Sequence, residues 1–250
     1  MPKKRLDEIL FEREVVESLA EARARIMAGE VIVQERRVDK AGTRFEQHVS
    51  IRMRGRKSHQ FVSRGGLKLE HALKTFELVV TDRVCLDLGS STGGFTDCLL
   101  QFGARSVYAV DVGYGLLDWS LRDDERVVCL ERTHAAKLSR SLVPEPIDVL
   151  VADISFNSLT RLIPPVLPLL SKAAMAVLLI KPQFEADRSQ VGPGGIVVDS
   201  NVHNQVCGAI VDAMVEMGAR VIGLTPSVIR GTRGNQEFLL ALDLRDLTEK

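Results

Sequence analysis

The sequence predicts an α/β fold, in which a doubly wound sheet of seven strands carries helices on both faces and follows a small unit of helices and strands. The main observation is the stretch from residue 84 to 100, which reads as a strand, a turn of glycines and small polar residues, and a helix. Apolar runs of strand length then alternate with helical segments almost to the C-terminus. With 250 residues, 45% of them apolar, the chain is long enough for one large domain and a small one.

Residues 5 to 53 form the predicted small unit. The apolar face of its first helix comprises Leu6, Ile9 and Leu10. A second helix runs from about Ser18 to a stop at Gly29. The residues expected on the buried face of that helix are Leu19, Ala22, Ile26 and Met27. Two short strands follow, at residues 31–33 and 49–53.

The large unit follows a linker and alternates strands with helices. We place the first domain at residues 1–58, the linker at 59–66 and the second domain at 67–250. The predicted strands are residues 84–88, 106–110, 126–130, 147–152, 174–180, 219–224 and 238–242. The predicted helices begin at Leu67 and Phe95 and span residues 159–170 and 201–217. This order predicts a parallel sheet, with a ligand site at the carboxyl ends of its strands.

The glycine turn is the first candidate for that site. Glycines at residues 89, 93 and 94 would let the backbone approach a ligand closely. Asp111 ends the next strand about 22 residues after Gly89, where an acid can accept hydrogen bonds from ribose hydroxyls. The turn lacks the spacing that holds a pyrophosphate, and Asp87 would repel phosphate. The pattern therefore favours S-adenosylmethionine over other nucleotides, with a purely structural turn as the remaining alternative.

Polar residues at other strand ends form the second candidate site. Asp153 and Lys181 each close an apolar strand, and Glu237 begins the last one. A lysine that follows such an apolar run is poorly solvated, which favours the neutral amine that can act as a base. Lys68 lies in the first turn of the predicted helix before the glycine turn. Taken singly, each of these residues also has an ordinary structural explanation, because a strand-end lysine often extends to water and a strand-end aspartate often caps the next helix.

Charge is distributed unevenly along the chain. The first 60 residues carry 14 Lys or Arg and 10 Asp or Glu, whereas the whole chain carries 33 of each. No acid lies between Glu46 and Glu70, and that interval contains Arg52, Arg54, Arg56, Lys57, Arg64 and Lys68. Such a run favours a nucleic-acid partner, and a solvated linker is the alternative. The four cysteines are isolated in apolar segments, which indicates reduced core residues, and no metal is expected.

The first domain resembles the S-four-type RNA-binding domain. Arg5-Leu6-Asp7 at the start of the first helix and the strand pattern after Gly29 carry this resemblance. It implies RNA contacts by Arg5, Arg23, Arg25 and Lys40. Gln34-Glu35 replaces the Asn-Gly that usually follows the strand in that family, so an acid lies where a phosphate is expected.

The whole chain resembles the TlyA family of rRNA ribose methyltransferases, which join such a domain to an FtsJ-type domain. The motifs that carry the resemblance are SRGGLKL at 63–69, LDLGSSTGGFTD at 86–97, AVDVGYG at 109–115, VADISF at 151–156, KPQFE at 181–185, VGPGGIV at 191–197 and GNQEF at 234–238. The resemblance implies a Rossmann-like class I methyltransferase sheet and S-adenosylmethionine as cofactor. It implies 2′-O-methylation of cytidine in rRNA of the large subunit, and also of the small subunit in longer members.

The family's functional residues fall on matching positions of this sequence. The implied catalytic set is Lys68, Asp153, Lys181 and Glu237, with Lys181 as general base. Cofactor contacts are expected from Asp87, Gly89, Ser91, Gly93, Phe95, Thr96, Asp111 and Asp153. Further RNA contacts are implied for Arg64, Arg132 and Arg188.

Two other functions remain open at this stage. Members of the family have also been labelled haemolysins, so a membrane-active protein is one alternative, although each strongly apolar segment is assigned to the sheet or its helices. A non-catalytic RNA-binding protein is the other. Residues 1–30 contain no apolar run of signal-peptide or membrane length, and no later stretch reaches eighteen apolar residues. We therefore expect a cytoplasmic protein with rRNA or ribosomal subunits as partners and no membrane partner. The sequence leaves the modified nucleotide, the ribosomal subunit and the oligomeric state undefined.

Overall fold

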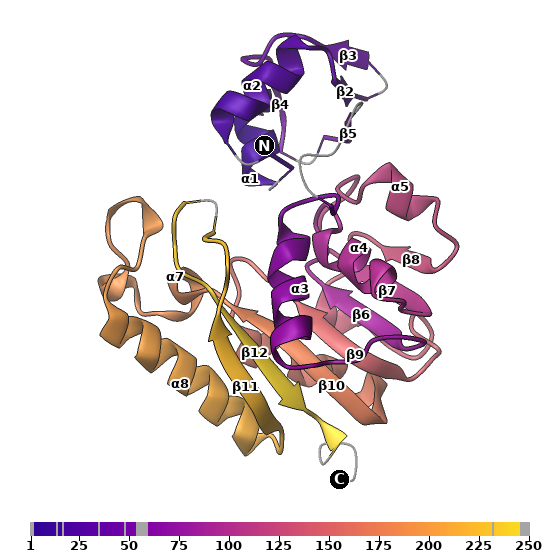
Figure 1. Cartoon of the computed structure of the whole chain (residues 1–250), viewed down its shortest axis with the longest axis vertical. Coiled ribbons are helices and arrows are strands. Elements are labelled where there is room, and N and C mark those ends of the chain that lie inside the picture. The colour runs from indigo at the N-terminus through magenta and orange to yellow at the C-terminus, as the bar shows by residue number, and fades with distance from the viewer. Residues whose placement is uncertain are drawn as a thin grey trace.

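A computed structural model describes residues 3–13, 15–16, 18–34, 36–47, 49–53, 60–231 and 233–245. A small N-terminal domain lies beyond one edge of a larger domain, and the last described strand, β12 (Phe238–Asp243), runs to the opposite end of the molecule (Figure 1). Glu35, the basic residues Arg54, Arg56 and Lys57 and the expected domain boundary at residue 58 fall outside the described residues.

The described part of the N-terminal domain contains two helices and two small antiparallel sheets. Its elements are β1 (Lys3–Arg5), α1 (Leu6–Glu12), α2 (Leu19–Met27), β2 (Val31–Val33), β3 (Arg36–Val38), β4 (Arg44–Glu46) and β5 (Ile51–Met53). Strand β1 pairs with β4, and β2 lies between β3 and β5. The two predicted helices and strand β2 are confirmed. Strands β1, β3 and β4 were missed because each is three residues long and mostly polar.

The helices of this domain bury most of their predicted apolar faces in a separate core, whereas Leu19 is only half-buried and lies outside it. The Ser18 side chain accepts a hydrogen bond from the Glu21 N–H and caps α2. The core comprises Leu6, Ile9, Leu10, Val16, Ala22, Ile26, Val31, Val33 and Val49. The prediction for Met27 is wrong, since its side chain is 67% exposed. Met27 is one residue beyond Ile26, so it points about 100° away from the buried face.

The large domain is built on a sheet of seven strands. These strands are β6 (Val84–Leu88), β7 (Ser106–Val110), β8 (Val127–Leu130), β9 (Ile147–Ala152), β10 (Leu170–Ile180), β11 (Arg220–Pro226) and β12 (Phe238–Asp243). Their order is β11-β12-β10-β9-β6-β7-β8. The expectation of a wholly parallel sheet is wrong, because β12 is antiparallel to both β10 and β11. A loop without a crossover helix joins β11 to β12, and only an antiparallel return is then possible.

Helices cover both faces of this sheet and enclose two apolar clusters. The helices are α3 (Gly65–Thr75), α4 (Gly94–Gln101), α5 (Trp119–Arg122), α6 (Leu159–Leu162), α7 (Pro182–Glu185) and α8 (Ser200–Glu216). Residues of α3, α4 and α5 pack on one face, and residues of α6 and α8 pack on the other. The helix expected over residues 159–170 ends at Leu162. Its second half, Pro164–Leu169, is a 3-10 helix, because prolines cannot supply the backbone donors of an α-helix.

Helix α3 begins two residues earlier than predicted. Gly65 and Gly66 form its first turn, and both have helical backbone geometry. A side chain at Gly66 would lie 2.4 Å from the ring of Phe61, and one at Gly94 would lie 2.9 Å from the Gly66 nitrogen. These glycines are therefore required for close packing of the α3 and α4 N-termini. Phe61 is fully buried beneath them, although it lies in the expected linker.

Candidate active site

The glycine turn after β6 lies at the carboxyl end of the central strands. Gly89 has a φ of 80°, and a side chain there would lie 2.5 Å from the Asp153 carbonyl oxygen. The N–H groups of Gly89 and Ser90 donate to the Val110 carbonyl at the end of β7. Only a glycine fits this close approach of two strand ends. Gly93, with a φ of 97°, then opens α4.

Asp111 follows β7 and faces this turn, as its spacing predicted. One carboxylate oxygen accepts from the Ser91 N–H at 2.9 Å, and the other accepts from the Gly113 N–H at 2.7 Å. The side chain is half-buried. Each oxygen retains lone-pair capacity for a further donor, so the carboxylate can still accept hydrogen bonds from a ligand.

Asp87, at the penultimate position of β6, is completely buried. Its Oδ2 accepts from Thr96 Oγ1 at 2.7 Å, whereas its Oδ1 has no hydrogen-bond partner among the described residues. Burial raises the pKa of Asp87 to about 7, and the negative charges of Asp153 and Asp111 act in the same direction, while the Thr96 hydrogen bond lowers it. A buried carboxyl with an unused acceptor is suited to a cationic ligand.

The glycine turn and Asp111 line a cavity of about 320 Å³, and Asp87 lies buried outside its lining. Its lining includes Gly89, Ser91, Asp111, Gly113, Leu116, Ile154 and Leu162. The cavity has the size of a small-molecule site, and its wall combines apolar side chains with a few polar groups. The acceptor oxygens of Asp111 and the close backbone of Gly89 in this cavity are suited to a nucleoside, and the carboxyl of Asp87 lies buried behind the turn.

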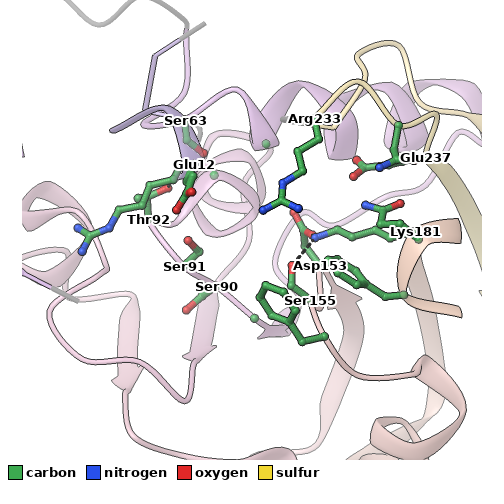
Figure 2. A pocket seen from close by; sticks show the side chains of 18 of the residues that line it. Glu12, Ser63, Ser90, Ser91, Thr92, Asp153, Ser155, Lys181, Arg233 and Glu237 are labelled. Carbon is green, nitrogen blue, oxygen red and sulfur yellow. Dashed lines mark hydrogen bonds and ion pairs between the residues drawn. The ribbon is translucent and has the colours of Figure 1, made fainter. Parts of the chain in front are cut away.

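A second cavity, of about 290 Å³, shares Gly89, Ser91 and Asp153 with the first. Lys181 projects into it, and its Nζ lies 2.5 Å from Asp153 Oδ1 (Figure 2). The same ammonium donates to Ser155 Oγ at 2.9 Å. Burial opposes ionisation of Asp153, but the charges of Lys181 and Lys68 and the hydrogen bond from Lys181 outweigh it, so the pKa of Asp153 lies below its usual value.

Lys68 and Glu237 form a buried ion pair beside the first pair. Lys68 Nζ lies 2.8 Å from Glu237 Oε2, and the two side chains are 1% and 3% exposed. A side chain at Gly231 would lie 2.4 Å from Glu237 Oε1, so the loop before β12 has no room for a larger residue there. All four residues of the predicted catalytic set therefore lie at one edge of the sheet, in two ion pairs.

Strand register explains why residues far apart in the sequence meet here. Leu88, the last residue of β6, pairs with Ala152 of β9, so Asp153 follows directly beside the glycine turn. Ile180 at the end of β10 pairs with Phe238 at the start of the antiparallel β12. Lys181 and Glu237 are thus brought to the same edge, and Lys68 reaches it from the first turn of α3.

The N-terminal domain also contributes to both cavities, which the sequence reasoning missed. Glu12, Arg13 and Gln47 line each of them, and Thr92 Oγ1 donates to the Arg13 carbonyl at 3.3 Å. Figure 2 shows Glu12 beside Thr92, above the glycine turn. No motif in the sequence signals these residues, because the contact joins separate domains.

The RNA-binding residues expected in the N-terminal domain differ in their surroundings. Arg5 and Arg23 both donate to the buried carboxylate of Asp7 at 2.9 Å, and Lys40 is exposed. Arg25 is 9% exposed, and its Nε donates to Glu30 at 2.9 Å. Arg25 is thus buried in the domain, and we do not retain it as a candidate RNA contact.

The three candidate RNA residues of the large domain lie on loops or at a helix end. Arg132, with a φ of 53°, is exposed and has its guanidinium 4.1 Å from the centre of the Tyr114 ring. Arg188 is exposed in a 3-10 turn, and Arg64 is half-buried at the N-cap of α3.

Other side chains around the second cavity were not anticipated. Ser155, Gln183, Phe156, Phe184, Arg233 and Asn235 line it. The rings of Phe156 and Phe184 lie 4.9 Å apart. All of these except Arg233 belong to motifs already noted, so their closeness in the sequence to Asp153, Lys181 and Glu237 was an available signal. In the part of the chain that the structure describes, no helix is both long and apolar enough to cross a membrane.

Comparison with known proteins assigns both domains to families. The FtsJ-like methyltransferase family matches residues 61–244, and the S4 domain family matches residues 4–49. YqxC of Bacillus subtilis, named as a candidate rRNA methyltransferase, is 45% identical over 96% of this chain and 85% of its own length. The 16S/23S rRNA (cytidine-2′-O)-methyltransferase TlyA of Mycobacterium tuberculosis is 40% identical over 95% of this chain and 89% of its own length.

A solved structure from Streptococcus thermophilus, named as a candidate hemolysin, is 40% identical. It has a TM-score of 0.77 and covers 97% of this chain and 89% of that chain. The resemblance inferred from the motifs is therefore confirmed. The chain belongs to the FtsJ-like methyltransferase family, within the TlyA group, and carries an S4 domain ahead of its methyltransferase domain.

Proposed function

We propose that this protein transfers a methyl group from S-adenosylmethionine to the 2′-hydroxyl of a cytidine in ribosomal RNA, with Lys181 as the general base. The observation that carries the proposal is the Lys181–Asp153 pair, which faces a cavity continuous with the glycine turn. A lysine and the cofactor position then lie on opposite sides of one space, as a transfer to a bound alcohol requires.

Lys181 would accept the proton of the hydroxyl as the oxygen attacks the methyl group. A ribose hydroxyl is a very weak acid, so its proton must leave during the attack. In the free protein the Lys181 ammonium is held by Asp153 and Ser155. Asp153 fixes the direction of the side chain, and the lysine acts as base once it has released its own proton to water.

The Lys68–Glu237 pair would support this step by holding charged groups in place beside Lys181. Glu237 holds the Lys68 ammonium in place beside the Lys181–Asp153 pair. Because both partners are almost fully buried, their positions are fixed before substrate binds.

S-adenosylmethionine would supply an electrophilic methyl group on a sulfonium. Asp111 would accept from its ribose, Gly89 and Ser91 would allow close approach of the backbone, and Asp87 would attract its positive charge. Three more residues would shape the cofactor site: Gly93 is the N-cap residue of α4, Phe95 lines the second cavity, and Thr96 donates to Asp87.

The S4 domain would supply RNA affinity through Arg5, Arg23 and Lys40, and the large domain through Arg64, Arg132 and Arg188. Ribosomal RNA as substrate is supported by the name of the mycobacterial relative, which acts on both 16S and 23S rRNA. We propose large-subunit rRNA as the main substrate, and a ribosomal substrate would place the protein in the cytoplasm.

The test is methyl transfer from labelled S-adenosylmethionine to ribosomal subunits by Lys181 variants. Both Lys181→Ala and Lys181→Arg should reduce turnover by about 100-fold or more, because arginine keeps the charge but does not release its proton. Cofactor affinity should stay within about twofold, since Lys181 acts on the hydroxyl. Lys74→Arg, an exposed lysine of α3, is the matched control. Near-normal turnover of Lys181→Arg would remove the general-base role.

A further inference from the structure

Arg233 lies in the loop between β11 and β12 and projects into the second cavity. Figure 2 shows its guanidinium directed into the space between the glycine turn and Lys181. Both Arg233 and Lys181 line this cavity, and Arg233 is an exposed residue of the loop between β11 and β12. None of the residues assigned to cofactor, catalysis or RNA includes this position.

The backbone around Arg233 is held by a hydrogen-bonded turn. The Gly231 N–H donates to the Asn235 carbonyl at 2.9 Å, and the Gly234 N–H donates to the Gly231 carbonyl at 2.8 Å. The buried side chain of Asn235 fixes the turn further, since it accepts from the Val197 N–H and donates to the Gly195 carbonyl, both at 2.9 Å. These hydrogen bonds therefore hold the backbone of the loop in place on both sides of Arg233.

The side chain of Arg233 lies close to Gly195. A Cβ atom at Gly195 would lie 3.3 Å from Nη1 of Arg233, and Gly195 has a φ of 77° that favours glycine. The guanidinium thus packs against backbone that offers no carboxylate. Within the described residues no acidic side chain forms an ion pair with it.

Among the described residues that line this cavity, both Arg233 and the half-buried Arg13 lack a carboxylate partner, so positive charge is in excess; Arg13 donates to the Gln47 carbonyl at 2.6 Å. Each carboxylate that lines the cavity already has a lysine partner, in the pairs Glu12–Lys4, Asp153–Lys181 and Glu237–Lys68. A cation directed into a cavity whose acids are all neutralised attracts an anion that enters from outside. The planar fork of a guanidinium matches two oxygens of a phosphate or a carboxylate.

We infer that Arg233 binds the phosphodiester on the 3′ side of the target ribose and so positions the 2′-hydroxyl over Lys181. This inference rests on the proposed function. In RNA the reacting 2′ oxygen and the 3′ oxygen that carries the phosphate are on adjacent carbon atoms. A group that holds this phosphate therefore fixes the hydroxyl, and its positive charge also stabilises the negative charge that develops on the attacking oxygen.

The methionine carboxylate of the cofactor is the other anion that could reach this cavity, and the experiment separates the two. Full-length Arg233→Ala, Arg233→Lys and wild-type proteins are compared for cofactor affinity by calorimetry, and for kcat and KM with purified ribosomal subunits. We expect KM for the subunits to rise about tenfold in Arg233→Ala, with cofactor Kd unchanged within about twofold. Arg233→Lys should recover part of the loss, because it keeps a positive charge without the fork.

Lys172→Ala serves as the matched control for loss of one positive charge. Lys172 is exposed near the start of β10, at the end of the sheet away from the cavity, and its KM should equal that of the wild type. The wild type also separates the two hypotheses, because absence of methyl transfer to any ribosomal substrate would refute the proposed function itself. An active wild type with the same KM as Arg233→Ala would overturn the role of Arg233. Weaker cofactor binding with unchanged KM for RNA would assign Arg233 to the methionine carboxylate instead.

Discussion

Removing Glu237 should test the buried ion pair most severely. Glu237→Ala leaves the ammonium of Lys68 in a site where its side chain is only 1% exposed. Breaking a buried pair at one end typically costs about 3–5 kcal/mol, because the remaining charge loses its partner but not its burial. We therefore expect the free energy of unfolding of the methyltransferase domain to fall by about this amount, measured by urea denaturation monitored by circular dichroism.

The Glu70–Lys74 pair of the same helix is the matched control. The two residues are one helical turn apart, Lys74 Nζ lies 2.6 Å from Glu70 Oε1, and the lysine side chain is 65% exposed. Glu70→Ala should cost only about 0.3–0.5 kcal/mol, as expected for an exposed pair.

The double variant Lys68→Met, Glu237→Ala completes the cycle. It removes the unpaired charge and should recover much of the stability that Glu237→Ala loses, while methyl transfer stays abolished in both. If Glu237→Ala costs no more than Glu70→Ala, the pair is not buried in the way that the structure indicates. If the double variant methylates RNA at the normal rate, the supporting role of the pair in catalysis is wrong.

Three further outcomes follow from the site. Asp111→Ala should weaken cofactor binding by about 2–4 kcal/mol, since two hydrogen bonds to a charged acceptor are lost, and equal affinity by calorimetry would remove Asp111 from the site. The buried carboxyl of Asp87 keeps its proton up to about pH 7 in the folded state but loses it near its ordinary, lower pKa when unfolded, so its contribution to stability falls as pH rises through this interval. The melting temperature of Asp87→Asn relative to the wild type should therefore be higher at pH 8 than at pH 5, and a constant difference would contradict the shift. Deleting residues 1–58 should weaken binding to ribosomal subunits and reduce its salt dependence, and unchanged binding at every salt concentration would assign the S4 domain another task.

The sequence predicted those parts of the fold whose signal is local. Strands β6 and β7 have the predicted bounds, and the spacing from Gly89 to Asp111 correctly placed that acid beside the turn. Hydrophobic periodicity also located α2 and α8, because an amphipathic helix records its buried face in its own residues. Burial of Met27 was predicted wrongly for a local reason too, since it lies one residue beyond Ile26 and points about 100° away from the buried face.

Features that depend on other elements could not be read in the same way. The antiparallel direction of β12 follows from how the chain returns after β11, and nothing in residues 238–242 encodes it. The burial of Arg25 depends on Glu30 and the surrounding core, although its sequence position is typical of a surface cation. The contribution of Glu12 and Arg13 to the cavities depends on how two domains meet.

The proposed catalytic set could be predicted only by combining local sequence signals with the arrangement of the strands and helices. Asp153 and Lys181 end predicted strands, so topology alone places them at one edge. Glu237 reaches that edge only because β12 is antiparallel, and Lys68 reaches it only because Gly66 and Gly94 let α3 approach α4 closely. The family motifs grouped these residues before the structure gave the physical reason.

The position of the new methyl group tests the central claim most directly. Ribosomal subunits from cells that lack the gene are incubated with purified protein and S-adenosylmethionine, and the rRNA is digested to nucleosides for mass spectrometry. We predict a single new product, 2′-O-methylcytidine, that is absent with Lys181→Ala and whose ribose, not its base, carries the added mass. A methyl group on the base, or equal product with Lys181→Ala, would contradict it. Red-cell lysis by wild type and Lys181→Ala alike, without RNA methylation, would support a membrane-active protein instead.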